Sequence, residues 1–136
     1  MGSILLVEAD SIIFDHWAAA IDAAGHAVFA AATTGQALPL IQEGGIDVVV
    51  IDAYDPRAGV LELARGMEAL PDAPPIVLIS GSPEAPEISA RIGAAAFLPK
   101  PCDPSEVVAA VTHLLRQLRP VRIVDDEPTG PNRQFS

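Results

Sequence analysis

Cysteine, aromatic residues and long apolar runs are all scarce in this chain, and each shortage excludes a class of protein. A single cysteine excludes an internal disulfide, and the sequence has no paired Cys/His spacing for zinc. Aromatic residues make up only 4% although half of the residues are hydrophobic, so the core must consist mainly of small aliphatic side chains. No apolar run approaches the roughly 18 residues of a membrane span, and no signal peptide precedes the first strand. We therefore expect a cytoplasmic domain without membrane contact.

Positive charge is scarce as well. The chain has 18 acidic side chains against 8 Lys and Arg, a formal net charge of −10, and Lys100 is its only lysine. Residues 1–118 carry the whole of this excess, because residues 119–136 hold equal numbers of acidic and basic side chains. A phosphate backbone would be repelled by such a surface, so we expect no direct binding to nucleic acid.

Short apolar runs alternate with amphipathic stretches, and this alternation predicts an α/β domain with a parallel sheet. The predicted strands are 3–8, 27–32, 46–51, 75–79 and 95–98. The predicted helices are 11–24, 35–44, 57–70, 84–93 and 104–118. The pattern fades near Pro120, so we predict one domain over residues 1–119 and a flexible tail over residues 120–136.

Helix signals are clearest at the last helix and poorest at the second. Asp103, Pro104 and Glu106 supply an acidic N-cap, a proline at the first helical position and a capping-box glutamate. Pro39 would instead fall inside the second helix, where proline removes a backbone hydrogen bond. We therefore expect the second helix to be short or distorted.

Charged side chains follow three of the predicted strands. Asp52 ends the third strand, Glu8 follows the first, and Lys100 follows the fifth. The carboxyl ends of parallel strands meet at one edge of the sheet, where open α/β folds place their sites. The pattern points to a signalling switch built on a phosphorylatable aspartate.

This arrangement resembles the receiver domain of bacterial response regulators over residues 3–118. The resemblance implies a flavodoxin-like (βα)5 fold, doubly wound, with a five-stranded parallel sheet in the order 2-1-3-4-5. Asp52 matches the aspartate that accepts phosphate from a histidine kinase. Ser80 matches the hydroxyl residue that turns toward the phosphoryl group, Lys100-Pro101 matches the lysine and its cis-bonded proline, and Phe97 matches the aromatic switch position.

The resemblance also implies a Mg²⁺ site, held by Glu8, Asp52 and the backbone carbonyl of Tyr54. The family has a second acidic ligand directly after the first, and Ala9 stands there in this chain. Mg²⁺ is normally held by one or two carboxylates and several waters, so we expect its binding to be weak or lost. Asp10 could replace the missing ligand, but it is also the natural cap of the first helix.

Three functions compete on these residues. The first is a stand-alone receiver in a phosphorelay, phosphorylated on Asp52 by a histidine kinase or phosphotransfer protein. It would signal through a partner protein at the face of the fourth helix, fifth strand and fifth helix; a homodimer is left open. The second is a pseudo-receiver, an interaction module that works without phosphorylation and keeps the fold but not the metal chemistry. Asp52 could also be purely structural, capping a helix or pairing with Lys100. A phosphatase is disfavoured because Tyr54 stands where such enzymes carry a second aspartate, so we expect no enzyme.

Overall fold

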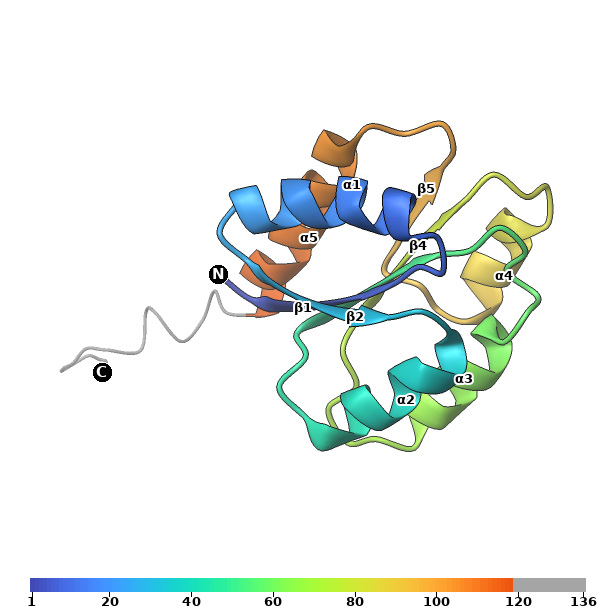
Figure 1. Ribbon diagram of the computed structural model, residues 1–136. Coiled ribbons are helices and arrows are strands. Elements are labelled where there is room, and N and C mark those ends of the chain that lie inside the picture. The colour runs from blue at the N-terminus through green and yellow to red at the C-terminus, as the bar shows by residue number, and fades with distance from the viewer. Residues whose placement is uncertain (119–136) are drawn as a thin grey trace, which may run out of the picture.

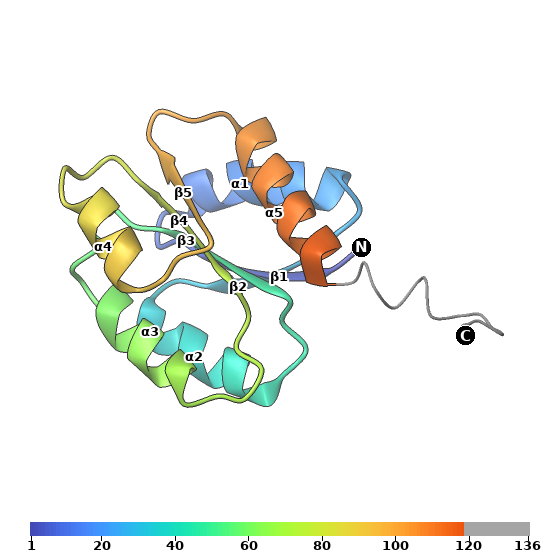
Figure 2. The ribbon, with the colours of Figure 1, turned by 180° about the vertical axis from the view of Figure 1, so that it is seen from behind.

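The computed structural model describes residues 1–118, which form a three-layer α/β domain (Figures 1 and 2). The predicted boundary at residue 119 and the predicted tail lie outside this part of the chain. The strands are β1 (Ser3–Val7), β2 (Ala27–Ala31), β3 (Val48–Asp52), β4 (Ile76–Ser80) and β5 (Ala96–Pro99). The helices are α1 (Ser11–Ala23), α2 (Thr34–Glu43), α3 (Val60–Glu68), α4 (Ala85–Arg91) and α5 (Pro104–Leu118).

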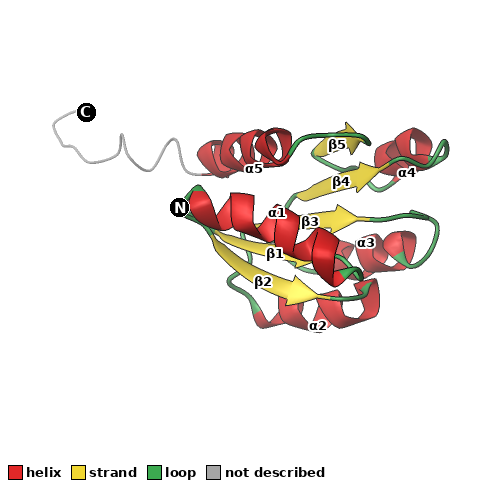
Figure 3. Ribbon diagram, turned by 45° about the horizontal axis from the view of Figure 1, so that its top comes forward, coloured by secondary structure: helices red, strands yellow, loops and turns green. Residues whose placement is uncertain are grey.

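The five strands are parallel and lie in the order β2-β1-β3-β4-β5, which confirms the predicted fold (Figure 3). Asp52 pairs in register with Ile79, and Ser80 pairs with Pro99. Asp52, Ser80 and Lys100 therefore reach the same edge of the sheet from three neighbouring strands.

Alternation along the buried strands builds a separate core on each face of the sheet. Val48 and Val50 face α1 and α5, whereas Val49 and Ile51 face α2, α3 and α4. Asp52 is the next residue in this alternation and falls on the side of α1 and α5. The side chain of Asp52 therefore lies on the face of the sheet that α1 covers.

The starts of α1 and α5 follow the sequence signals. The Asp10 carboxylate caps α1 by accepting the N–H groups of Ile12 and Ile13. At α5, the Glu106 carboxylate accepts the backbone N–H of Asp103 at 2.8 Å, as a capping box requires.

Two helices differ from the predictions. The α2 helix runs continuously over ten residues with Pro39 inside it, so the expected shortening is wrong. The α3 helix begins three residues later than predicted, because Gly59 adopts a left-handed conformation with φ of 86°. A Cβ atom on Gly59 would also collide with Thr34, so the loop before α3 depends on this glycine.

Among residues 1–118, no helix is both long enough and apolar enough to cross a membrane.

Candidate functional site

Asp52 is the centre of the polar cluster at the carboxyl edge of the sheet. Its side chain is only 1% exposed, and its Oδ1 atom lies 2.7 Å from Nζ of Lys100. The Lys100–Pro101 peptide bond that follows β5 is cis, as the resemblance implies. The lone lysine therefore provides the positive charge that a buried carboxylate needs.

Trp17 is a second partner of Asp52. The indole Nε1–H of Trp17 donates to Oδ2 of Asp52 at 2.7 Å, and the side chain is 5% exposed in the middle of α1. Helical spacing places Trp17 on the inward face of this helix, but the sequence pattern does not reveal that its N–H reaches the sheet edge. Both oxygens of the Asp52 carboxylate thus have a donor.

Glu8 lies beside Asp52 but, unlike it, has a carboxylate oxygen without a hydrogen-bond partner among the described residues. One carboxylate oxygen accepts the backbone N–H of Asp10 at 3.0 Å, while Oε1 is buried and has no hydrogen-bond partner among the described residues. Burial, and then the neighbouring Asp52 carboxylate, raise the pKa of Glu8 to about 7, although the backbone N–H of Asp10 and the charge of Lys100 act in the opposite direction. Near neutral pH, part of the protein population therefore carries a protonated Glu8.

The predicted ligands Glu8, Asp52 and Tyr54 line one hollow of about 380 Å³ at this edge. An unpartnered buried carboxylate oxygen next to a second carboxylate is an arrangement that suits a hard cation. The residues present fit Mg²⁺, but they supply only two carboxylates. Within residues 1–118 no group of three or more His, Cys, Asp and Glu side chains is placed to hold a metal.

The other nearby acids are already engaged. Asp10 caps α1, and Asp55 forms hydrogen bonds and an ion pair with Arg57, with Nε–Oδ1 at 3.1 Å. The Arg57 guanidinium accordingly lowers the pKa of the Asp55 carboxyl. Neither acid contacts Asp52 through a hydrogen bond, so Ala9 is not compensated by either of them in this state.

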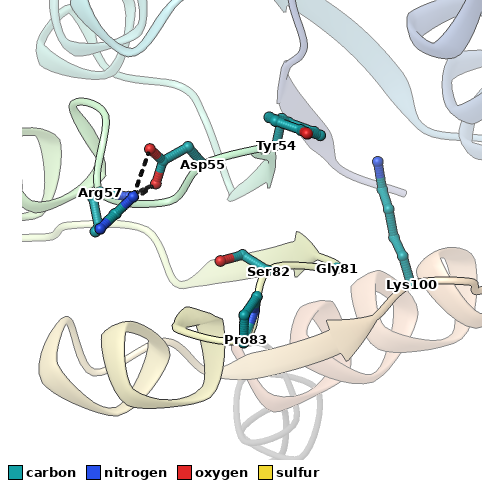
Figure 4. A pocket seen from close by; sticks show the side chains of 7 residues that line it. All are labelled: Tyr54, Asp55, Arg57, Gly81, Ser82, Pro83 and Lys100. Atoms are coloured by element: carbon teal, nitrogen blue, oxygen red, sulfur yellow. Dashed lines mark hydrogen bonds and ion pairs between the residues drawn. The ribbon is translucent and has the colours of Figure 1, made fainter.

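A second hollow, of about 410 Å³, adjoins the first, and Tyr54 and Asp55 line both (Figure 4). Lys100, just after β5, lies on one side of it and the Asp55–Arg57 pair on the other, with Gly81 and Ser82 between them. A Cβ atom on Gly81 would lie 3.4 Å from Cβ of Lys100, which is van der Waals contact.

The two predicted switch residues lie on the adjoining strands β4 and β5. Ser80 is buried at the end of β4, and its Oγ accepts the backbone N–H of Ser82 at 3.1 Å, while the hydroxyl keeps its own hydrogen as a donor. Phe97 is half-buried against the core under α2, α3 and α4, on the face of the sheet opposite to that of Asp52. The structure brings Asp52, Glu8 and Lys100 together, places Ser80 on the adjoining strand end, and leaves Phe97 outside the cluster.

Known proteins resemble this chain in sequence and in fold. The family model described as "Response regulator receiver domain" matches residues 4–112. Response regulator MprA of Mycobacterium sp. (strain KMS) is 31% identical over 97% of this chain and 56% of the relative. The phosphate regulon transcriptional regulatory protein PhoB of Pseudomonas aeruginosa is 31% identical over 87% of this chain and 53% of the relative. The chain thus spans about half the length of these curated relatives.

Solved structures give the same picture. A CheY-like receiver domain protein from Methanospirillum hungatei matches with a TM-score of 0.75 and 25% identity, over 88% of this chain and 98% of that one. NtrX from Brucella abortus, solved in complex with ADP, matches with a TM-score of 0.75 and 26% identity, over 93% of this chain and 29% of that one.

Proposed function

The chain belongs to the response regulator receiver domain family of two-component signalling, and from this membership we propose that Asp52 accepts a phosphoryl group from a histidine kinase or a phosphotransfer protein. Receiver domains are signalling modules rather than classical enzymes. The observation that carries the proposal is the buried Asp52 carboxylate held 2.7 Å from the only lysine, at the edge where three strands end.

The residues present supply most of the chemistry that this transfer needs. A carboxylate oxygen of Asp52 attacks phosphorus, the P–N bond of the donor phosphohistidine breaks, and the imidazole leaves with the bonding electron pair. Lys100 offsets the negative charge of the incoming group, and the Ser80 hydroxyl donates to a phosphoryl oxygen. A divalent cation bound by Glu8, Asp52 and the Tyr54 carbonyl would neutralise further charge.

The signal would leave through protein contacts at the face formed by α4, β5 and α5. Ser80 and Phe97 support this choice because they lie on adjoining strands: Leu78 pairs with Phe97, and Ser80 pairs with Pro99. A movement of Ser80 toward a phosphoryl group would therefore displace β5 and with it the half-buried Phe97 ring. A cytoplasmic location and the absence of nucleic-acid contacts by this acidic domain stay predictions.

The direct test is chemical phosphorylation. Incubation with phosphoramidate and Mg²⁺ should add one phosphoryl group, detected by intact mass, and Asp52→Asn should remove the adduct. Asp55→Asn is the matched control, since it changes a neighbouring aspartate of the same loop and should keep the adduct. An adduct that persists in Asp52→Asn would contradict the proposal.

A pseudo-receiver is the second candidate, favoured by two observations. Ala9 removes an acidic ligand, and both oxygens of Asp52 already have donors. In this alternative the Asp52–Lys100 pair is structural, and the domain recruits its partner without phosphorylation. Absence of an adduct in the wild-type protein at every Mg²⁺ concentration would favour it.

A further inference from the structure

The contact between Trp17 and Asp52 has no part in the phosphoryl transfer described above. Each oxygen of a carboxylate keeps a second lone pair when it accepts one hydrogen bond, so a nucleophilic carboxylate needs above all an oxygen that an incoming phosphorus atom can reach. In this structure Lys100 takes Oδ1 and the Trp17 indole takes Oδ2, each at 2.7 Å. The carboxylate is therefore enclosed by its own protein, with a side chain that is 1% exposed.

The two donors are not equivalent. Lys100 carries a positive charge and is 34% exposed, so it can follow an incoming phosphoryl group while still neutralising it. The indole N–H is a neutral donor that accepts nothing, and Trp17 is 5% exposed. A hydrogen bond from Trp17 thus stabilises the ionised carboxylate and occupies Oδ2 without adding the charge that the transfer needs.

The site also leaves the indole room to move. A hollow of about 350 Å³ lies beside it, lined by Ile12, Ile13, His16 and Trp17 of α1 and by residues 100–102. The His16 ring lies 5.5 Å from the Trp17 ring on the outer side of the helix. Rotation of the indole toward this hollow would free Oδ2 without unfolding α1.

We propose that Trp17 is a positioning residue that closes the phosphoacceptor in the resting protein. Its N–H holds Oδ2 of Asp52, and both a phosphoryl group and a divalent cation must displace it. Ala9 favours the Trp17–Asp52 hydrogen bond, because the second carboxylate that would help to bind a competing cation at Asp52 is missing. The inference rests on the proposed function for phosphorylation, but its effect on cation binding is independent of that function.

The wild-type protein itself provides the first test, because Trp17 is its only tryptophan and gives one indole N–H resonance in an NMR spectrum. We expect this resonance to be protected from hydrogen exchange. Titration with Mg²⁺ should shift it and reduce the protection. A resonance that does not respond while Mg²⁺ shifts the amides of residues 8 and 52 would overturn the inference.

The second test uses Trp17→Phe, which removes the N–H and keeps an aromatic ring. Loss of one charge-assisted hydrogen bond should raise the rate of phosphorylation by phosphoramidate roughly ten-fold and tighten cation binding several-fold. Cation binding is measured as competition of Mg²⁺ with Mn²⁺, followed by the free Mn²⁺ resonance. Ile21→Val, which trims a fully buried residue one turn further along α1, is the matched packing control and should leave both values unchanged.

The outcomes separate the two proposals. If neither protein is phosphorylated but Trp17→Phe binds Mg²⁺ more tightly, the proposed function fails and the role of Trp17 stands. If phosphorylation occurs at the same or a lower rate in Trp17→Phe and Mg²⁺ affinity is unchanged, Trp17 is only a core residue.

Discussion

The two ends of the sheet both bury polar side chains, but they use them differently. At the amino end, His26 and Asp47 accept backbone N–H groups at the start of the chain: Nδ1 of His26 from Gly2, just before β1, at 3.2 Å, and Oδ2 of Asp47 from Ser3 at 2.8 Å. At the carboxyl end, side chains pair with one another across β3, α1 and the residue after β5. Contacts to the backbone fix a strand in place, whereas contacts between side chains can be exchanged for a ligand.

Each end also contains a buried atom without a hydrogen-bond partner in residues 1–118. These atoms are Oε1 of Glu8 and Nε2 of His26. Glu8 lines a hollow together with the Asp52 carboxylate, whereas His26 lines none of the hollows described above. The unpartnered Oε1 of Glu8 therefore indicates a ligand site at the carboxyl end, whereas the unpartnered Nε2 of His26 at the amino end only lowers stability.

The pKa shifts of these two groups favour the neutral form at both ends, with opposite effects on stability. The raised pKa of Glu8 contributes stability that is full below about 4.5 and is lost as the pH rises through about 7. Burial, and then the charge of the amino terminus, lowers the pKa of His26, so its contribution is present above 6.5 and is lost as the pH falls. Acidification from neutral pH should therefore strengthen the carboxyl end and weaken the amino end.

The largest expected effect comes from removing the only lysine. Lys100→Met leaves the buried Asp52 carboxylate with a neutral donor alone, next to Glu8. We expect the free energy of unfolding to fall by about 2–3 kcal/mol at pH 7.5. This is less than the full value for a buried pair, because Lys100 is partly exposed. Urea midpoints of the two proteins at pH 7.5 and pH 5 measure it, and the gap should narrow at pH 5, where one carboxylate can be protonated.

Arg57→Met is the control for this comparison, because it breaks an exposed ion pair in the same region and should leave the urea midpoint unchanged. If the gap between wild type and Lys100→Met is as large at pH 5 as at pH 7.5, Lys100 does not compensate the acidic cluster.

A smaller effect is expected when the missing ligand is restored. Ala9→Asp adds a carboxylate to the hollow that Glu8 and Asp52 line, and should tighten Mg²⁺ binding roughly ten-fold, on the order of 1.4 kcal/mol. Titration followed by Trp17 emission measures it, since the indole contacts Asp52 directly. Ala9→Asn supplies an oxygen without the charge and should give a smaller gain. Equal affinities for wild type and Ala9→Asp would mean that Asp10 or Asp55 moves in to complete the site.

Sequence reasoning predicted the parts of this comparison that depend on periodicity. Alternating apolar runs gave the strands, parallel strands gave one common carboxyl edge, and Asp52, Glu8 and Lys100 therefore had to lie near one another. The contact of a side chain across that edge follows no period, so helical spacing places Trp17 on the inward face of α1 but does not reveal its hydrogen bond to Asp52. The expected shortening at Pro39 was wrong: α2 continues through the proline and buries Ala37 and Ile41 on both sides of it.

The amino end carries no sequence signal of comparable strength. His26 follows Gly25 in a turn, and nothing in its neighbours indicates that it is buried against the backbone of Gly2. A scattered histidine is more often exposed, so its burial depends on the docking of β2 beside β1. Contacts between a side chain and a distant backbone group are set by the completed fold.

The smallest expected effect is the pH response of that histidine. It is best measured in a Glu8→Gln background, which removes the opposing titration at the carboxyl end. In this background, acidification from pH 7.5 to pH 5.5 should cost less than about 1 kcal/mol, because protonated His26 cannot accept the N–H of Gly2. Adding His26→Asn keeps an acceptor that does not titrate, so the urea midpoint should then vary less between the two pH values. If Glu8→Gln loses the same stability on acidification with and without His26→Asn, the pH response arises from other groups and the protonation of His26 does not affect stability.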